Sequence, residues 1–385
     1  MTDFGDQAIL TIDLDALVAN WRMLGAMAPN SRCGGVVKAD GYGLGAAKVA
    51  AALYAAGCRD FFVAHTGEGV ALRQSLATDA RIHILHGVPA GAEAEHVACG
   101  LIPVLSSPDQ IARWAAECRR QGKALPASLQ VDTGMHRLGL QTDEFAGLLA
   151  DRDTLAAIDF QHLVSHLACA DTPEHPQNAL QLANFRAALA RLPGLKGSFA
   201  NSAGILLGAD YQFDLLRPGI GLYGSNPRAP ASSPYHPLPV AHLQAPILQI
   251  RDVDSDGAVG YGATYRVEKP RRIATLAAGY ADGVLRALSN SGLAAIDGLA
   301  TIEMFGGKGI AGPVTVPIVG RVSMDMLAVD VSAVDESFCR PGMPVTLFGG
   351  AVDIDAQAQA AGTIAYELLT RMGPRVQRRY IGGAA

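Results

Sequence analysis

The stretch Val36-Val37-Lys38-Ala39-Asp40-Gly41-Tyr42-Gly43-Leu44-Gly45 joins an apolar run, a lysine and a glycine-rich turn. Residues 34–37 predict a short buried strand, because the run is apolar, ends in β-branched residues and is flanked by glycine. Lys38 therefore falls at the carboxyl end of a strand, and the glycines after it let the backbone turn sharply and approach a ligand closely. A lone lysine here most often only extends its amine to water. The spacing of Lys38, Tyr42 and Gly45 favours a functional site.

The composition indicates a globular protein with large cores. Of the 385 residues, 49% are hydrophobic and 17% are charged, and a chain of this length most naturally forms two domains. The net charge of −5 and the pI near 6.0 give no electrostatic reason to expect binding to nucleic acid or to an anionic membrane. The sequence has no apolar run of the ~18 residues that a membrane span needs. Residues 1–10 do not match a signal peptide, so we expect a cytoplasmic location.

The cysteines do not predict a metal site. They are scattered and form no C-x-x-C pair, which argues against zinc and against a disulfide framework in a chain of this size. We therefore expect free thiols, packed mostly as small hydrophobic side chains, at Cys33, Cys58, Cys99, Cys118, Cys169 and Cys339.

Strand and helix patterns alternate through the first part of the chain. A helix is expected at residues 16–27, and further helices lie between most of the strands, for example at 46–56, 108–121 and 177–192. This alternation fits an N-terminal (β/α)8 barrel better than an open doubly wound sheet. The expected strands lie near residues 33–38, 61–65, 82–86, 102–105, 126–131, 158–165, 197–201 and 213–217.

The pattern changes at a proline-rich stretch. Five prolines fall within residues 227–239, which is typical of a linker. Beyond it, short apolar runs between glycine turns predict a mainly β domain that ends in a helix at residues 353–372. The expected domains are therefore 1–235 and 236–385. The expected strands of the second domain are 240–253, 272–278, 299–305, 314–319, 326–331 and 343–348.

Polar groups follow several of the predicted barrel strands. In a barrel, the carboxyl ends of the strands share one rim, which carries the functional groups and commonly holds phosphate. Five such groups on one rim indicate a phosphorylated ligand or cofactor. They are Lys38 with Tyr42, the run 132–139, Ser165 with His166, Asn201 with Ser202, and the run 217–221.

Together these segments resemble the alanine racemase family. Its pattern recurs in order over almost the whole chain: the lysine stretch, D-T-G-M-x-R-L-G, S-H-L-A, A-N-S-A, R-P-G-I-G-L-Y-G, Y-G-A-T-Y, G-Y-A-D-G, G-R-V-S-M-D-M and T-I-A-Y-E. No single piece is decisive, but their joint order is very hard to obtain by chance. The resemblance implies a barrel followed by a mainly β domain, pyridoxal 5′-phosphate as cofactor, alanine as substrate and a homodimer whose sites are shared across the interface.

The resemblance also implies the catalytic groups. Lys38 would bind the cofactor covalently and act as the base on one face of the substrate, which suits an amine that is a nucleophile once it is desolvated and neutral. Tyr261, contributed by the other subunit, would be the base on the opposite face. His166 would orient that tyrosine, and Arg217 would face the pyridine nitrogen and discourage its protonation.

Further positions match binding groups of the family. The side chains of Tyr42, Ser202 and Tyr366 and the backbone amides of Gly219 and Ile220 match a cradle for the phosphate. The substrate would be bound by Arg137, Met324, Tyr280 and Asp325. Without the resemblance, Tyr366 and Met324 would be taken as core residues, His166 as a structural histidine and Asp325 as a turn residue.

The chain departs from the common family pattern near two of these groups. Asp40, Gly41 and Leu44 change the turn after Lys38 but supply none of the chemistry. Gln130 stands where many members carry a carbamylated lysine. A glutamine cannot be carbamylated, although its amide oxygen is able to accept a hydrogen bond from Arg137. We therefore expect no carbamate beside Arg137.

Other functions stay open at this point. Alanine interconversion would supply D-alanine for cell-wall peptide or degrade one isomer. A racemase of serine, of lysine or of a broader set of amino acids would use the same groups, because a methylene changes binding by only ~1–3 kcal/mol. A barrel-type decarboxylase would not need Tyr261. A non-catalytic pyridoxal-phosphate carrier is usually a lone barrel, so the second domain counts against it.

Overall fold

The structure is a computed structural model of the chain that describes residues 5–228, 233–300 and 310–383. The chain divides into two compact units. The N-terminal unit is Leu17–Leu238. The C-terminal unit is Pro239–Gly383 together with the stretch that ends at Ala16.

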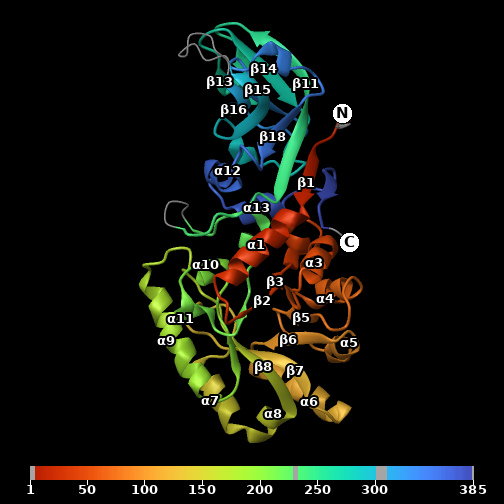
Figure 1. Cartoon of the computed structure of the whole chain (residues 1–385), viewed down its shortest axis with the longest axis vertical. Coiled ribbons are helices and arrows are strands. Elements are labelled where there is room, and N and C mark those ends of the chain that lie inside the picture. The colour runs from red at the N-terminus through yellow and green to blue at the C-terminus, as the bar shows by residue number, and fades with distance from the viewer. Residues whose placement is uncertain (1–4, 229–232, 301–309, 384–385) are drawn as a thin grey trace. The chain divides into compact units, whose positions relative to one another are not determined.

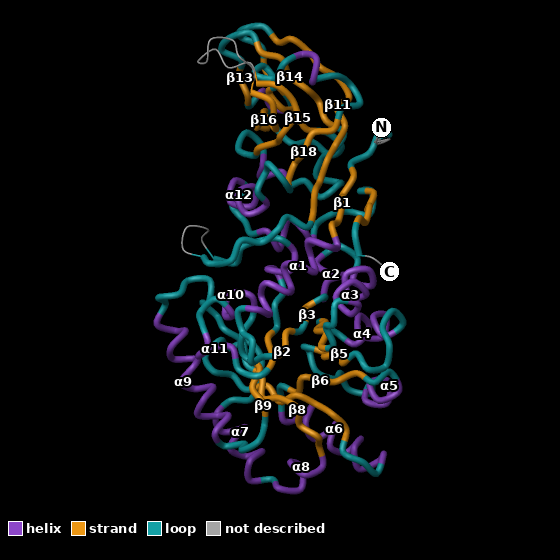
Figure 2. The backbone as a smooth tube through the Cα atoms, viewed as in Figure 1, coloured by secondary structure: helices purple, strands orange, loops and turns teal. Residues whose placement is uncertain are grey.

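The N-terminal unit contains a parallel sheet whose strands follow the order of the sequence. Its strands are β3 (Gly35–Val36), β4 (Asp60–Val63), β5 (Arg81–Ile84), β6 (Leu101–Leu105), β7 (Leu125–Gln130), β8 (Ile158–Val164) and β9 (Lys196–Ser198). Figures 1 and 2 show these strands inside a layer of helices. Parallel strands joined by helices bury both faces of the sheet, which is why these strands are short and apolar.

The sheet closes on itself through its first and last strands. The strand β10 (Leu215–Leu216) pairs in parallel with β2 (Arg32–Cys33). The Gly34 amide then donates to the Leu216 carbonyl (3.0 Å), and the Val36 amide donates to the Pro218 carbonyl (3.0 Å). A Cβ at Gly34 would lie 2.9 Å from the Asp60 carbonyl, so this seam requires glycine. The predicted (β/α)8 barrel is thus confirmed, with the predicted first strand divided into β2 and β3.

The helices of this unit follow local sequence signals. In α6, for example, Ser107 caps the first turn by accepting from the Gln110 amide (3.3 Å), Pro108 stands at the start, and Gly122 ends the helix in a left-handed conformation. The elements are α1 (Leu14–Ala26), α2 (Lys38–Tyr42), α3 (Ala46–Ala55), α4 (Thr66–Arg73), α5 (Glu93–Ala98), α6 (Pro108–Gln121), α7 (Thr142–Ala150), α8 (Arg152–Ala157), α9 (Pro176–Ala190), α10 (Ser202–Ile205), α11 (Ala209–Gln212) and η1 (Ile220–Tyr223).

The C-terminal unit is built on an antiparallel sheet that closes into a barrel. The long strand β11 (Ala241–Val253) pairs with β14 (Arg271–Leu276) along its second half and with β18 (Pro344–Phe348) along its first half. The ring is completed by β15 (Leu293–Ala300), β16 (Ile310–Val319) and β17 (Leu327–Asp330). The predicted mainly β domain is therefore confirmed. The unit also contains β12 (Ala258–Val259), β13 (Tyr265–Arg266), η3 (Tyr261–Ala263), η4 (Arg286–Leu288) and η6 (Glu336–Phe338).

Three details differ from the sequence prediction. The strands β1 (Ile9–Asp13) and β19 (Gln377–Ile381) were not expected, and β1 joins β11 of the C-terminal unit to β19. The expected helix 353–372 is two helices, α12 (Ile354–Ala360) and α13 (Ala365–Thr370), because the chain turns at Gly362 with a φ of +67°. For the expected strand 299–305, β15 covers residues up to Ala300, and positions 301–305 lie outside the described residues.

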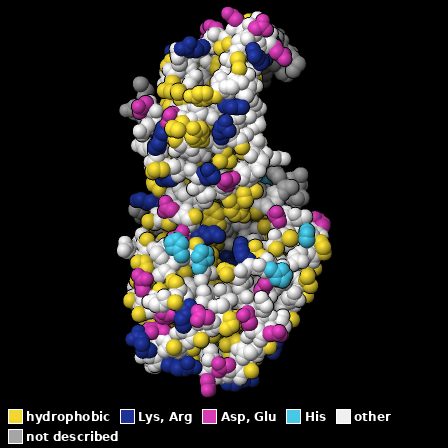
Figure 3. Space-filling view, turned by 180° about the vertical axis from the view of Figure 1, so that it is seen from behind, with side chains coloured by type: hydrophobic (Ala, Val, Ile, Leu, Met, Phe, Trp, Pro, Cys, Tyr) yellow, Lys and Arg dark blue, Asp and Glu magenta, His cyan; other side chains and the backbone are white. Residues whose placement is uncertain are grey.

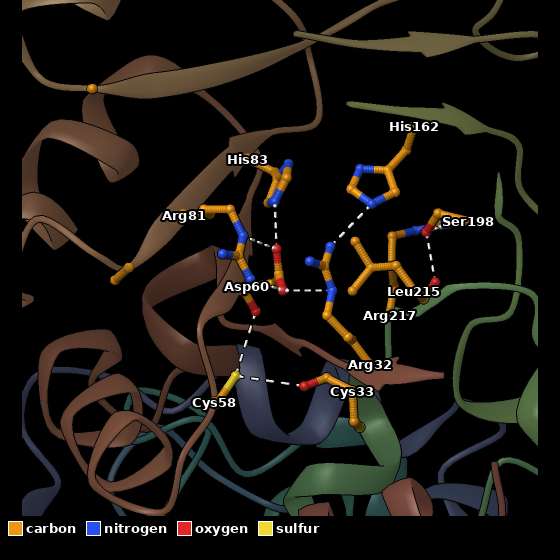
Figure 4. Close-up of polar contacts among 12 residues, drawn as sticks. Arg32, Cys33, Cys58, Asp60, Arg81, His83, His162, Ser198, Leu215 and Arg217 are labelled. Atoms are coloured by element: carbon orange, nitrogen blue, oxygen red, sulfur yellow. Dashed lines mark hydrogen bonds and ion pairs between the residues drawn. The ribbon is translucent and has the colours of Figure 1, made fainter. Parts of the chain in front are cut away.

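A charged cluster occupies the end of the N-terminal barrel at which the strands begin (Figure 4). The buried Asp60 carboxylate accepts from the Arg81 guanidinium (2.7 Å) and from His83 Nε2 (3.2 Å). Arg32 lies 3.6 Å from the same carboxylate and bonds to His162 Nε2 (3.1 Å). These contacts tie β2, β4, β5 and β8 together, and this end of a barrel serves stability.

The protonation states of this cluster follow from its burial. Burial, the His83 ring and the Arg32 charge lower the pKa of His162 to about 3. Burial also lowers the pKa of His83, although Asp60 opposes the shift. For Asp60, burial favours protonation, but the hydrogen bonds from Arg81 and His83 outweigh it and lower the pKa well below its ordinary value. The cluster therefore holds one carboxylate, two guanidinium groups and two neutral imidazoles at neutral pH.

We expect His162→Gln to make the stability of the protein less sensitive to acid. A histidine in the unfolded chain binds a proton near pH 6.5, whereas folded His162 binds one only near pH 3. Between these values the unfolded chain holds one more proton, so the free energy of unfolding falls by up to about 1.4 kcal/mol per pH unit as the pH falls. Glutamine does not titrate, so urea unfolding between pH 6 and 4 should show a slope shallower by about one proton.

The control for this experiment is His236→Gln. The His236 side chain is exposed in the folded protein, so this variant should keep the slope of the original protein. An unchanged slope in His162→Gln would mean that the folded barrel accommodates an imidazolium at position 162, contrary to the expected state.

Candidate functional site

Lys38 lies at the start of a left-handed turn. It begins α2, one residue after β3 ends, and the next residues Ala39, Asp40, Gly41 and Tyr42 have φ values of +53°, +52°, +63° and +57°. The sequence predicted a glycine-assisted turn here, but three residues other than glycine also take the left-handed conformation. Each costs roughly 1–2 kcal/mol, so contacts around the turn must hold it in place.

The Lys38 amine is half-buried and stands among cationic groups. Burial lowers its pKa below the ordinary lysine value, the Arg137 charge lowers it further, and the Glu68 carboxylate opposes both effects. Lys38 and Arg137 are thus brought within electrostatic reach of each other, although they follow different strands. A lysine with a lowered pKa loses its proton more readily than an exposed lysine, which favours its use as a nucleophile and a proton acceptor.

His166 and Arg217 form the opposite part of the same rim. Arg217 Nη2 lies 3.4 Å from His166 Nδ1. Burial and the charges of Arg217, Arg137 and Lys38 lower the pKa of His166 to about 3, so the imidazole is neutral. The structure therefore gathers the four groups that the sequence placed at the strand ends: Lys38, Arg137, His166 and Arg217.

Arg217 keeps its charge inside the barrel because its donors are satisfied. Its guanidinium donates to Ser198 Oγ (2.7 Å) and to the carbonyls of Ser165 (2.6 Å) and Phe199 (3.3 Å). Burial lowers its pKa to about 10, which still leaves a cation at neutral pH. These bonds also fix the direction of the guanidinium, since the acceptors come from β9 and from the ends of β8 and β9.

Ser202 and Gly219 form a small polar corner next to Tyr42. The buried Ser202 Oγ accepts from the backbone amides of Gly219 (2.9 Å) and Gly221 (3.1 Å). Because the oxygen accepts twice, its own proton is left to donate. The Tyr42 hydroxyl lies so close to Gly219 that a Cβ at that position would be 2.3 Å away, and the Tyr42 ring stacks on Tyr223 (4.5 Å between centroids).

This corner differs from the sequence expectation in one respect. The Gly219 amide was expected to face a phosphate, but it donates to Ser202 Oγ. The donors that the corner can direct at an anion are therefore the Ser202 and Tyr42 hydroxyls and the Ile220 amide at the start of η1. Such a set of hydroxyls and a main-chain amide binds a dianion without a cationic side chain.

The loop that carries Arg137 is held by hydrogen bonds from its backbone amides to the Asp132 carboxylate. Asp132 Oδ1 accepts from the amides of Gly134 (2.9 Å), Met135 (3.0 Å) and His136 (3.1 Å), which presents the exposed Arg137 beyond them. The Gln130 amide was considered as an acceptor for Arg137. In the structure its nitrogen donates to the Leu138 carbonyl (3.2 Å), so the side chain supports the loop that carries Arg137.

Sequence reasoning missed a residue that links two of these segments. The buried Gln181 of α9 donates to Thr133 Oγ1 (3.2 Å) and to the His166 carbonyl (2.9 Å), and it accepts from the Ala168 amide (2.9 Å). Gln177, one turn earlier, donates to the Gly134 carbonyl (2.6 Å). Amide side chains four residues apart on the inner face of a helix were the available signal.

The remaining predicted residues belong to the C-terminal unit and are exposed. The exposed fractions are 73% for Tyr261, 53% for Met324, 44% for Tyr280 and 40% for Tyr366. Figure 3 shows hydrophobic side chains gathered on the surface of this unit. A group of exposed apolar side chains of this kind is typical of an interaction surface.

Two loops of the C-terminal unit bring Tyr280, Met324 and Asp325 together. The Tyr280 amide donates to the Ser323 carbonyl and the Ala281 amide to the Met324 carbonyl (3.0 Å each). A Cβ at Gly279 would lie 2.3 Å from the Met324 carbonyl, so the approach depends on glycine. Asp325 pairs with Arg375 (2.7 Å). The nearby turn with Tyr261 rests on Arg321, since a Cβ at Gly262 would lie 3.2 Å from that guanidinium.

Across the part of the chain that the structure describes, no group of histidine, cysteine and acidic side chains is arranged to hold a metal ion. Among the same residues, every helix is too short or too polar to cross a bilayer.

Comparison with known proteins identifies the family. The sequence model of the alanine racemase N-terminal domain matches residues 12–227, and that of the C-terminal domain matches residues 240–380. The chain belongs to the alanine racemase family. The resemblance that the sequence motifs indicated is thereby confirmed.

Individual relatives match over their whole length. An alanine racemase of Rhodospirillum rubrum is 50% identical over 376 residues, which are 97% of this chain and 96% of that protein. A crystal structure of the Bartonella henselae alanine racemase with covalently bound pyridoxal phosphate is 40% identical, with a TM-score of 0.89 over 98% of this chain and 100% of that chain. The biosynthetic alanine racemase of Pseudomonas aeruginosa is 35% identical, with a TM-score of 0.86 over 98% and 100% of the two chains.

Proposed function

We propose that this protein interconverts L-alanine and D-alanine with pyridoxal 5′-phosphate. The observation that carries the proposal is that a lysine of lowered pKa and a buried arginine, whose two terminal nitrogens are hydrogen-bonded, both lie near His166 at one rim of the barrel. Full-length likeness to alanine racemases supports it.

The residues at the rim fit the cofactor. Lys38, whose pKa is lowered, would provide the amine for the covalent link, and the corner of Ser202, Tyr42 and Ile220 would provide donors for the phosphate. We propose Tyr366 of the C-terminal unit as a further hydroxyl. Bound pyridoxal phosphate supplies an electron sink for the charge left when an α-proton is removed. Arg217 holds a fixed cation where the ring nitrogen would lie, which disfavours protonation of that nitrogen and so limits the sink.

Racemisation needs one proton-transfer group on each face of the substrate. Lys38 takes or returns the α-proton at Nζ on one face, which its lowered pKa permits. Tyr261 of the partner subunit serves the other face, and the neutral His166 orients its hydroxyl. Support comes from the 73% exposure of Tyr261 and from the exposed Met324 in the same unit, which suit a surface that a second copy of the chain covers.

The substrate is bound by the exposed Arg137 and by the two loops of the C-terminal unit that carry Tyr280, Met324 and Asp325. The guanidinium binds the substrate carboxylate, for which its fork geometry is suited. Met324, Tyr280 and Asp325 limit the space for the side chain, and Arg375 fixes Asp325. The alternatives are an enzyme with serine or lysine as substrate and a pyridoxal-phosphate carrier without turnover. We propose the cytoplasm as the location, because all the cysteines are free thiols.

We expect the holoenzyme in D2O to lose the optical rotation of L-alanine while deuterium enters the α-position of both isomers. The reason is that a proton removed by either base exchanges with solvent before it is returned. Polarimetry and mass spectrometry would follow the two signals in one sample. Optical rotation that persists with alanine but disappears with serine or lysine would mean that one of those amino acids is the substrate. Cofactor absorbance without exchange in any amino acid would favour the carrier.

We expect Lys38→Ala and Tyr261→Phe each to reduce kcat by at least ~10²-fold, the lower bound of the contribution of a positioned general base. In Tyr261→Phe the cofactor should still bind to Lys38, so its visible absorbance persists. Tyr54→Phe, which removes only a hydroxyl that donates to Asp79, is the control and should keep kcat. Racemisation that persists in Tyr261→Phe would rule out the second base.

Mixing the two inactive variants tests whether the site is shared between subunits. In a hybrid dimer of Lys38→Ala with Tyr261→Phe, one of the two sites has both wild-type groups if Tyr261 acts on the partner. After subunit exchange at equal concentrations, hybrids are about half of the dimers, so about a quarter of the wild-type kcat should return. A mixture that stays inactive although native mass spectrometry detects hybrids would place Tyr261 in the site of its own chain.

We expect Ser202→Ala to weaken cofactor binding by about 10-fold or more. The change removes a hydroxyl that would donate to the phosphate, and a lost hydrogen bond to a charged group costs about 1.5–3 kcal/mol. Titration of the apoenzyme with pyridoxal phosphate, followed by absorbance, gives the Kd. Ser291→Ala, which removes only an exposed contact with the Ala287 carbonyl, is the control. An unchanged Kd in Ser202→Ala would exclude this corner as the phosphate site.

A further inference from the structure

Glu68 connects the turn after Lys38 to the end of the neighbouring strand. It lies in the first turn of α4, and its carboxylate is largely covered. Oε1 accepts from the Ala39 amide (2.7 Å), directly after Lys38, and Oε2 accepts from the Ala64 amide (2.7 Å), directly after β4. Charge-assisted bonds of this length are stronger than neutral ones. One side chain therefore clamps the backbone at the ends of two adjacent barrel strands.

The segment held by this clamp does not take its conformation from intrinsic preference. Ala39, Asp40 and Tyr42 all have left-handed φ values, which residues other than glycine adopt only at a cost. A conformation of this kind persists when the surroundings determine it. The far end of the turn is fixed by Asp40 Oδ1, which accepts from the Ala46 amide (2.8 Å). At the near end, next to Lys38, the Glu68 carboxylate provides the corresponding bond.

We propose that Glu68 is a positioning residue of the reaction, because its carboxylate fixes the strained turn and with it the direction in which the Lys38 side chain leaves the barrel wall. The inference deepens the proposed function, since it concerns the same lysine. Tyr42 ends the same turn, so the clamp also sets the place of its hydroxyl against Gly219. The proposed role of Glu68 requires no contact with the substrate or the cofactor.

The charge of Glu68 adds a second effect that can be measured separately. The charged and titratable groups around Lys38 are Arg137 after β7, His166 after β8 and Glu68 in α4, with His65 3.9 Å from Glu68. Burial and Arg137 lower the pKa of Lys38, and Glu68 raises it. Removing only the negative charge should therefore lower the pKa of Lys38 further.

The experiment compares Glu68→Gln with Glu144→Gln. Both glutamates lie in the first turn of a helix, and both carboxylates accept a hydrogen bond from a backbone amide. Glu144, however, caps α7 by accepting from the Gln141 amide (2.9 Å) and has no contact with the Lys38 turn. Holoenzyme is stripped of pyridoxal phosphate and recombined with it, and the rate constant is measured against pH by visible absorbance. The rate rises with pH as Lys38 loses its proton and reaches a plateau set by how well the amine is placed.

For Glu68→Gln we expect the plateau to fall by about 10-fold, as for one lost hydrogen bond to a charged acceptor. The midpoint should move to lower pH. The kcat for L-alanine should fall by a similar factor with KM nearly unchanged, because Arg137 lies on another loop. Glu144→Gln should alter neither the plateau nor the midpoint. A plateau that stays within twofold of wild type, or that falls equally in Glu144→Gln, would overturn the proposal.

A second change tests whether the loss comes from the turn. Glycine adopts a φ of +53° without strain, so Ala39→Gly in the Glu68→Gln background should restore much of the plateau. A shifted midpoint with no restoration would mean that the carboxylate acts through its charge alone, against a positioning role. Because recombination does not require turnover, a wild-type protein that binds the cofactor without racemising alanine would contradict the proposed function and leave this test intact.

Discussion

The site depends on the burial of Arg217 as a cation. A guanidinium does not lose its proton under ordinary conditions, and its bonds to Ser198, Ser165 and Phe199 make its place inside the barrel tolerable. The neighbouring groups then adjust to it. His166, 3.4 Å away, cannot hold a second positive charge and is neutral, and Lys38 has a lowered pKa beside Arg137. The lowered pKa of the lysine thus follows first from its burial and second from Arg137, which the fold brings near it by placing the strand ends on one rim.

The two ends of the N-terminal barrel treat buried charge differently. Where the strands begin, the Asp60 carboxylate lies between Arg32 and Arg81, so this anion is paired with side-chain cations. Where the strands end, the Asp132 carboxylate is occupied by three backbone amides, and Glu68 is occupied by two. Those anions accept hydrogen bonds from backbone amides and stabilise loops. The first arrangement serves stability, whereas the second leaves groups available for chemistry.

Much of this organisation could be predicted from the sequence because local sequence patterns encode it. Apolar runs followed by polar groups at the strand ends predicted the barrel and its functional rim, and the motifs identified the family. The unpredicted strands β1 and β19 are specified by partners far away in the chain, and β19 carries the polar run Gln377-Arg378-Arg379, which lacks an apolar alternation. The bond between the Gly219 amide and Ser202 and the clamp by Glu68 depend on distances between separate loops, which no local pattern encodes.

The barrel unit supplies only part of what racemisation needs. It contains an amine able to exchange a proton, Lys38, but the neutral His166 next to Arg217 is a poor acceptor, since a second cation there would face the same repulsion. On the proposed two-base route the other acceptor must carry negative charge when deprotonated. A phenol suits this requirement: its unperturbed pKa of about 10 is too high for a base at neutral pH, but nearby positive charge favours the phenolate. A base that is negative when deprotonated would therefore gain from the same cationic surroundings that, together with burial, lower the pKa of Lys38.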